Sequence, residues 1–170
     1  MSKNIYFTGF MGSGKTSASK RLCALSGANW IDTDDEIERV TGKTISQIFA
    51  EDGEENFRQT ETEVLRNIAS LDDITVVSCG GGLVLRDENV NIMQNSGSVI
   101  YLSANPETIY EHVRYSHNRP LLEGNMNPEY IGKLLDKRLP FYERAADYSI
   151  ITDGKDIDQI ASEIYSIFFA

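Results

Sequence analysis

Short apolar runs alternate with stretches of helical spacing along the chain, a pattern typical of α/β proteins. The runs expected to form strands lie at 5–7, 30–32, 75–78, 98–102 and 148–152. Helical spacing predicts helices at about 15–25, 34–42, 45–49, 53–70, 87–94, 105–114, 128–138 and 156–168. Strands separated by helices form right-handed βαβ units. The pattern therefore predicts a three-layer α/β/α fold, with a parallel sheet covered on both faces.

Local signals predict where two of these helices begin or end. Asp34 or Asp35 is expected to cap the helix that ends near Gly42. Pro140 is expected to end or kink the helix that contains it, because proline lacks the backbone N–H group. No repeat, low-complexity tract or Pro/Ser linker divides the chain, so residues 1–170 are expected to form one domain.

Composition and charge narrow the class of protein. The 170 residues carry a net charge of −10, which argues against a nucleic-acid-binding surface. No apolar run is long enough to span a bilayer, and the first residues lack the layout of a signal peptide. Cys23 and Cys79 have no metal-ligand spacing, which suits free thiols in a reducing compartment. We therefore expect a cytoplasmic protein without a membrane partner.

The strongest motif is the glycine-rich stretch GFMGSGKT, which follows the first expected strand. Gly9, Gly14, Lys15 and Thr16 match the phosphate-binding pattern G-x4-G-K-[ST]. Gly12 and Gly14 allow the loop to wrap closely around phosphates, which its N–H groups and the next helix would hold. Lys15 is expected to reach the β- and γ-phosphates, and the Thr16 hydroxyl to ligate Mg²⁺. An accidental glycine-rich turn is the alternative, and the flanking strand and helix argue against it.

Carboxylates follow the second expected strand, in the stretch WIDTDDEI. Asp32 and Asp34 are two residues apart, so they would face the same side of an extended chain. Given the phosphate-binding loop, one is expected near the metal and one near the phosphoryl acceptor. The structural alternative is that Asp34 or Asp35 only caps the next helix.

Three arginines are candidates for binding an anion, because a guanidinium group pairs with carboxylate or phosphate in two-pronged fashion. Arg58 lies near the start of a helix, and Arg138 precedes the stretch LPFYER. Arg119 lies in the stretch HNRPLLEGNMNPE, whose weak periodicity, proline and glycine predict a mobile lid. Each of the three, taken singly, would be assigned to the solvated surface.

Three consecutive glycines, Gly80, Gly81 and Gly82, follow the third expected strand. They fit either a sharp turn or a place where a ligand approaches the bare backbone. Their position at the carboxyl end of a parallel strand, where α/β proteins bind ligands, favours the second reading.

The ordered set of motifs resembles the shikimate kinases over nearly the whole chain. The pieces are GFMGSGKT, DTD at 32–34, TGKTISQIFAEDGEENFR at 41–58, SCGGG at 78–82, RPLL at 119–122 and KRLPFYE at 137–143. The resemblance implies a P-loop kinase fold with a five-stranded parallel sheet in the order 2-3-1-4-5. It also implies a substrate-binding region at about 33–60, a lid at about 114–126 and a monomer.

The activity implied is transfer of the ATP γ-phosphate to the 3-hydroxyl of shikimate, on the route to chorismate and aromatic amino acids. Asp34 would bind shikimate hydroxyls and act as a base or only orient the acceptor. Arg58 and Arg138 would hold the substrate carboxylate, and residues 80–82 would line the pocket. Arg119 would act on the transferring phosphate with Lys15, while Asp32 would hold Mg²⁺ through water. The nucleotide-binding residues implied are Gly12, Ser13, Gly14, Lys15, Thr16, Ser17 and Arg119, with Arg114 and Lys155 at the adenine end.

Other functions share parts of this pattern. A gluconate or nucleoside-monophosphate kinase would also use a phosphate-binding loop and a lid, without needing the FR, GGG and KRxP pieces together. A GTP-dependent switch is disfavoured, because the sequence has neither N-K-x-D nor D-x-x-G. A catalytically silent nucleotide-binding protein has little support, because each expected catalytic residue type is present.

Overall fold

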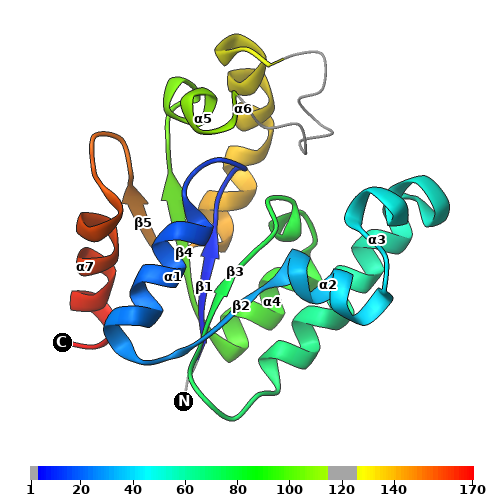
Figure 1. Ribbon diagram of the computed structural model, residues 1–170, viewed down its shortest axis with the longest axis horizontal. Helices are drawn as coiled ribbons and strands as arrows, with labels where there is room; N and C mark the ends of the chain where they lie inside the picture. The colour runs from blue at the N-terminus through cyan, green and yellow to red at the C-terminus, as the bar shows by residue number, and fades with distance from the viewer. Residues whose placement is uncertain (1–3, 115–125) are drawn as a thin grey trace.

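A parallel sheet with helices on both faces forms the centre of the molecule (Figure 1). The computed structural model describes residues 4–114 and 126–170. The strands are β1 (Asn4–Thr8), β2 (Asn29–Asp32), β3 (Thr75–Ser78), β4 (Gly97–Ser103) and β5 (Tyr148–Ile151). Their order, β2-β3-β1-β4-β5 with every pair parallel, confirms the topology that the resemblance implied.

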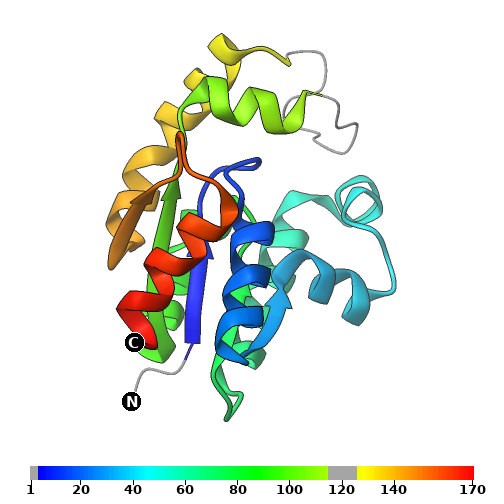
Figure 2. The same ribbon diagram turned by 60° about the vertical axis from the view of Figure 1, so that its left-hand side comes forward.

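The described ranges also contain seven α-helices and one short 3₁₀-helix, the last α-helix following β5. They are α1 (Lys15–Ser26), α2 (Thr33–Thr41), α3 (Ile45–Ala69), η1 (Leu83–Leu85), α4 (Asp87–Ser96), α5 (Pro106–Val113), α6 (Pro128–Ala145) and α7 (Ile157–Phe168). Figure 2 shows α1 and α7 side by side on one face of the sheet. Among the described residues, no helix has the length and apolarity that crossing a membrane would require.

Alternate residues of the central strands enter two separate cores. Ile5 and Phe7 of β1 pack in the core formed with α1 and α7. Tyr6, between them, belongs to the larger core on the opposite face, which includes residues of α3, α4 and α6. Side chains alternate across a strand, so a strand buried on both faces appears in sequence as an unbroken apolar run. This explains why β1, β3 and β4 were predictable from short runs.

The start of α2 differs from the prediction. Asp32, the last residue of β2, is the N-cap, and its Oδ1 accepts from the N–H groups of Asp34 and Asp35 at 2.9 and 3.0 Å. Asp34 and Asp35 therefore lie in the first helical turn, and the expectation that one of them is the cap was wrong. The chain is also not extended from 32 to 34. The two carboxylates reach the same region because a strand end and a helix start meet there.

One further boundary agrees with the prediction and one differs. The span α3 consists of two helical segments that meet at Gly53, whose φ of 85° and ψ of 166° are non-helical, in agreement with the helices predicted at 45–49 and 53–70. Pro140 lies inside α6, which continues to Ala145 instead of ending there. Tyr142 and Ala145 are fully buried beyond the proline, so their packing offsets the lost backbone hydrogen bond. Most of the expected lid lies outside the described residues.

Candidate active site

The glycine-rich loop connects β1 to the start of α1. Gly12 and Gly14 have φ values of 77° and 95°, which L-residues with side chains rarely adopt. Lys15 folds back over the loop, and its Nζ donates to the carbonyls of Gly9 and Phe10 at 2.6 and 3.1 Å. The loop therefore presents an ammonium group above a helix N-terminus, the arrangement that binds phosphate.

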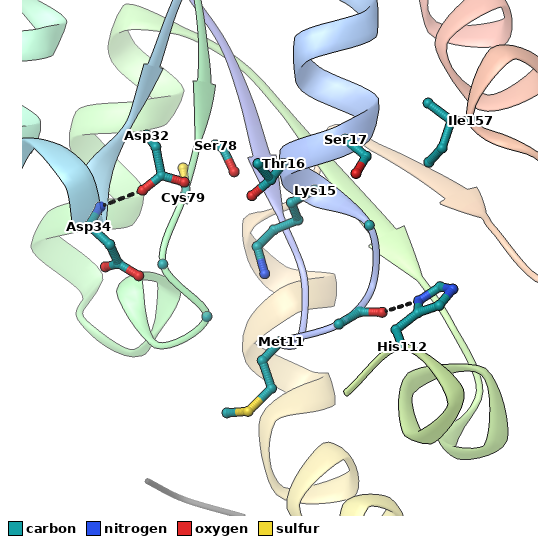
Figure 3. Close-up of a pocket in the computed structure, with 14 residues that line it drawn as sticks. Met11, Lys15, Thr16, Ser17, Asp32, Asp34, Ser78, Cys79, His112 and Ile157 are labelled. Atoms are coloured by element: carbon teal, nitrogen blue, oxygen red, sulfur yellow. Dashed lines mark hydrogen bonds between the residues drawn. The ribbon is translucent and has the colours of Figure 1, made fainter. Parts of the chain in front are cut away.

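A cavity of about 430 Å³ lies over this loop (Figure 3). The predicted residues that line it are Gly12, Gly14, Lys15, Thr16, Ser17, Asp32, Asp34, Gly80 and Gly81. The strand ends of β2 and β3 form the wall opposite the loop. The structure thus brings the expected phosphate-binding and acidic residues to one place, at the carboxyl edge of the sheet, where α/β proteins bind ligands.

The Thr16 hydroxyl and the Asp32 carboxylate face this same cavity (Figure 3). Oδ1 of Asp32 takes both helix-capping hydrogen bonds, and burial raises the pKa of this carboxyl. A nearby cation would offset that burial. No group of three His, Cys, Asp or Glu side chains capable of holding a metal occurs within 4–114 and 126–170. The Thr16 hydroxyl and the Asp32 carboxylate would suit Mg²⁺ whose other ligands are phosphate oxygens of a nucleotide and water. Phosphate-binding loops hold Mg²⁺ in this way.

A second cavity, of about 530 Å³, adjoins the first. It lies between the α2–α3 region and α6, and Arg58, Glu61 and Arg138 contribute to its lining. Met11, Asp34, Gly80 and Gly81 line both cavities. Asp34 is therefore the place where a molecule in the second cavity would meet a phosphate that the glycine-rich loop holds in the first.

Asp34 is the acid at this junction. Burial raises its pKa to about 6, and the neighbouring Asp32 carboxylate adds to the increase. Lys15 and, to a smaller extent, Arg58 oppose it. A carboxyl group with a pKa close to neutral is suited to accepting a proton from an acceptor hydroxyl.

Glu61 is a functional candidate that the sequence analysis missed. Its side chain is 1% exposed, and its Oε1 accepts from Nη1 of Arg58 at 3.0 Å. The other oxygen, Oε2, is buried without a hydrogen-bond partner among the described residues. Burial raises the pKa of Glu61 to about 7, despite the opposing charge of Arg58. The signal in the sequence was an acid at a core-facing helical position, in register with Phe57, Val64 and Leu65.

The three glycines make room for charged side chains. A Cβ atom on Gly80 would lie 2.9 Å from Asp34 Oδ1 and 3.1 Å from Glu61 Oε2. On Gly82 it would lie 2.6 Å from both terminal nitrogens of Arg58. None of the three has a positive φ, so close approach and not backbone conformation requires glycine here. Gly82 lines neither cavity, which differs from the expected pocket lining.

Tyr142, also missed in the sequence, holds the glycine turn against α6. Its hydroxyl donates to the Gly81 carbonyl at 2.6 Å, and its ring stacks on Tyr101 with centroids 5.0 Å apart. Burial raises the pKa of Tyr142 to about 12, and the charge of nearby Arg138 opposes the increase. The phenol therefore lies near both Gly81 and the second arginine of the cavity.

Several predicted nucleotide-binding residues lie elsewhere. Ser13 is buried and does not line the cavity, and its N–H donates to the Phe10 carbonyl. Arg114 pairs with Glu111, and Lys155 pairs with Glu163, so neither side chain lines the cavity. His112 and Ile157 line its outer end instead. Arg119 lies outside the described residues.

Comparison with known proteins identifies the family of this chain. The shikimate kinase family model matches residues 11–168. The shikimate kinase of Dictyoglomus turgidum is 44% identical over 167 residues, covering 96% of this chain and 96% of its own. That of Pelotomaculum thermopropionicum is 43% identical over 162 residues, covering 95% and 93%.

A solved structure is similar over the same length. It is the shikimate kinase from Acinetobacter baumannii in complex with shikimate, with a TM-score of 0.91 and 35% identity. The match covers 98% of this chain and 93% of that one. Together, the family match and these identities show that the chain belongs to the shikimate kinase family.

Proposed function

We propose that this enzyme transfers the γ-phosphate of ATP to the 3-hydroxyl of shikimate, on the route to chorismate and aromatic amino acids. The observation that carries the proposal is the junction of two cavities at Asp34, Gly80 and Gly81. One cavity has the phosphate-binding loop, and the other has two guanidinium groups. Donor and acceptor would therefore meet across a single carboxylate.

The acceptor cavity suits a small hydroxylated carboxylic acid. Arg58 from α3 and Arg138 from α6 both line it, and a carboxylate would bind between such groups. Asp34 would hold the hydroxyl groups of the ring. The Acinetobacter relative was solved in complex with shikimate, which supports the same ligand here.

The donor cavity suits ATP with Mg²⁺ held by Thr16 and, through water, by Asp32. Bound Mg²⁺ would neutralise phosphate charge during transfer. Lys15 would stabilise the charge on the transferring group, and Arg119 would add a second positive charge from the lid. Asp34 would orient the acceptor hydroxyl and accept its proton at the carboxylate. We further propose one domain over residues 1–170, working as a monomer in the cytoplasm.

An acceptor comparison tests the proposal. Purified protein with ATP and Mg²⁺ is offered shikimate, gluconate and nucleoside monophosphates, and ADP release is measured. We expect turnover with shikimate alone, because the other acceptors lack its combination of a ring carboxylate and adjacent hydroxyls. Turnover of gluconate or a nucleotide without shikimate turnover would contradict it, as would strong preference for GTP over ATP.

A further inference from the structure

His112, near the end of α5, contacts the phosphate-binding loop from outside. Its Nδ1 lies 2.5 Å from the carbonyl oxygen of Gly12, across a hundred residues of sequence (Figure 3). The ring is solvent-exposed and lines the outer end of the nucleotide cavity. This contact joins α5 to the part of the loop that precedes Lys15.

The partner determines which nitrogen carries hydrogen. A peptide carbonyl only accepts hydrogen bonds, so Nδ1 of His112 must be the donor. Nδ1 donates in the neutral ring with this tautomer, and it also donates in the protonated ring. The contact with Gly12 therefore does not require either charge state.

A loop that binds phosphate must keep its own carbonyl oxygens from repelling the anion. The Gly9 and Phe10 carbonyls accept from the Lys15 ammonium, and the Gly14 carbonyl accepts from the Ala18 N–H within α1. The Gly12 carbonyl is bonded to His112 instead. His112 thus engages a carbonyl at the exposed outer end of the cavity that would otherwise be available to turn towards the phosphates.

The peptide between Gly12 and Ser13 is held at both ends. Its carbonyl is bonded to His112, and its N–H, which belongs to Ser13, donates to the Phe10 carbonyl at 3.1 Å. The loop also packs directly on α5, because a Cβ on Gly12 would lie 2.6 Å from Val113 Cγ1. A peptide held at both ends fixes the direction of the N–H groups that follow it.

We propose that His112 is a positioning residue of the phosphate-binding loop and that its Nδ1–H bond to Gly12 sets the affinity for nucleotide phosphates. The inference rests on the proposed function only in requiring that the loop binds a nucleoside polyphosphate. It does not depend on which acceptor is phosphorylated. Shikimate binding is expected to be independent of His112, because this side chain does not line the second cavity.

Three substitutions distinguish the effect of the Nδ1 hydrogen bond from the effect of the imidazole ring itself. His112→Ala removes the donor, and His112→Phe keeps a ring of similar size without it. His112→Asn places an amide nitrogen where Nδ1 was, bonded to the same Cγ. Glu107→Gln is the matched control, an exposed residue of α5 that lines neither cavity.

The dissociation constant for ADP with Mg²⁺ is measured by calorimetry, alongside KM for ATP and KM for shikimate. Losing one hydrogen bond should weaken ADP binding about three- to tenfold in His112→Ala and His112→Phe. His112→Asn and Glu107→Gln should stay within about twofold of the parent. KM for ATP should rise in parallel, while KM for shikimate stays unchanged.

Unchanged ADP affinity in His112→Ala would overturn the inference. So would equal weakening in His112→Asn and His112→Ala, because that would assign the effect to the ring and not to the Nδ1 donor. A protein that binds ADP as described but fails to phosphorylate shikimate would contradict the proposed function while leaving this inference supported.

Discussion

Glu61 is the most unusual side chain of the site, because an acid is buried at the edge of a core. Its contact with Arg58 gives it one charged partner, while its second oxygen has none among the described residues. Burying an ion in this way costs free energy unless pairing offsets the lost hydration. The raised pKa indicates that the offset is incomplete.

The raised pKa of Glu61 predicts a pH-dependent stability. A folded pKa of about 7, above the usual value of 4.5, means that the folded state binds the proton more tightly. The folded state gains its full stabilisation from the protonated Glu61 carboxyl below pH 4.5. This contribution to the free energy of unfolding is lost as the pH rises through 7. Glu61→Gln should therefore raise the free energy of unfolding at pH 8 by on the order of 2–3 kcal/mol, and have little effect at pH 4.

Urea denaturation at the two pH values measures this difference. A destabilised Glu61→Gln protein at pH 8 would contradict the prediction, because it would mean that the ionised pair with Arg58 outweighs burial.

Removing Arg58 should lower both the affinity for shikimate and the stability of the folded protein. Arg58→Ala removes one of two guanidinium groups in the acceptor cavity, so shikimate affinity should fall about 30-fold or more, with ATP affinity nearly unchanged. It also leaves Glu61 buried without its cation, so Glu61 should bind a proton, and the resulting loss of stability should be small at pH 7 and grow as the pH rises above it.

The double variant Arg58→Ala/Glu61→Gln is the control. It should recover most of the lost stability and none of the lost shikimate affinity, measured by calorimetry and thermal unfolding. Arg58→Ala that weakened ATP binding and spared shikimate would show that the guanidinium serves the other cavity.

Lys15 should act mainly in the transition state. Lys15→Ala removes positive charge where charge is redistributed during transfer, so kcat should fall about 10²- to 10³-fold. The dissociation constant for shikimate should change little, because Lys15 does not line the second cavity. A variant with normal kcat and only a raised KM for ATP would indicate a ground-state binding role instead.

At the scale of elements, the glycine turn after β3 brings three structural units together. Its first residue faces acids from α2 and α3, its second is bonded to Tyr142 of α6, and its third faces Arg58. The turn therefore sets the distances between charged groups that the sheet alone would not hold. The sequence predicted that a ligand approaches the bare backbone of this turn. In the structure, the side chains of Asp34, Glu61 and Arg58 approach it closely.

Alanine substitutions along this turn should have graded effects. At Gly80 and Gly82 the new methyl group would approach Asp34 or Arg58 closer than 3.0 Å, so these side chains must shift. At Gly81 the nearest atom lies 3.4 Å away, which is ordinary contact. We expect KM for shikimate to rise about tenfold or more in Gly80→Ala and Gly82→Ala, and less in Gly81→Ala, because charged groups move out of place.

Thermal unfolding is the second measurement on these variants. The obstructing atoms are ends of side chains, so the melting temperatures should fall much less than the substrate affinities. A large loss of stability with normal shikimate affinity would support the simpler reading of a structural turn.

Local sequence signals predicted the elements well and their ends less well. The strands β1, β3 and β4 are apolar because both of their faces are buried, and periodicity detects that directly. The helix cap at Asp32 was misplaced because three acids in four residues offered equivalent capping groups. The expectation that Pro140 could end its helix was wrong, because the packing of Tyr142 against the core, which keeps α6 continuous, is a tertiary effect.

At the scale of the whole molecule, the site combines motifs that are far apart in sequence. The phosphate-binding loop, the acids after β2 and the glycine turn all lie at strand ends, so a parallel sheet alone predicts that they meet. Helical register places Glu61 on the core-facing side of α3, but the sheet edge alone does not predict that Glu61, His112 and Tyr142 belong to the site. Their contacts depend on how α3, α5 and α6 pack against that edge, which is a tertiary effect.

Phosphate donor and acceptor are proposed to meet at Asp34, where the two cavities join. The most direct measurement is the identity of the product formed from ATP and shikimate, determined by phosphorus and proton NMR. Transfer across the junction predicts a single phosphate ester on the 3-hydroxyl, formed in equal amount to ADP. Free phosphate with unmodified shikimate, or an ester on another hydroxyl, would contradict the proposed arrangement of donor and acceptor.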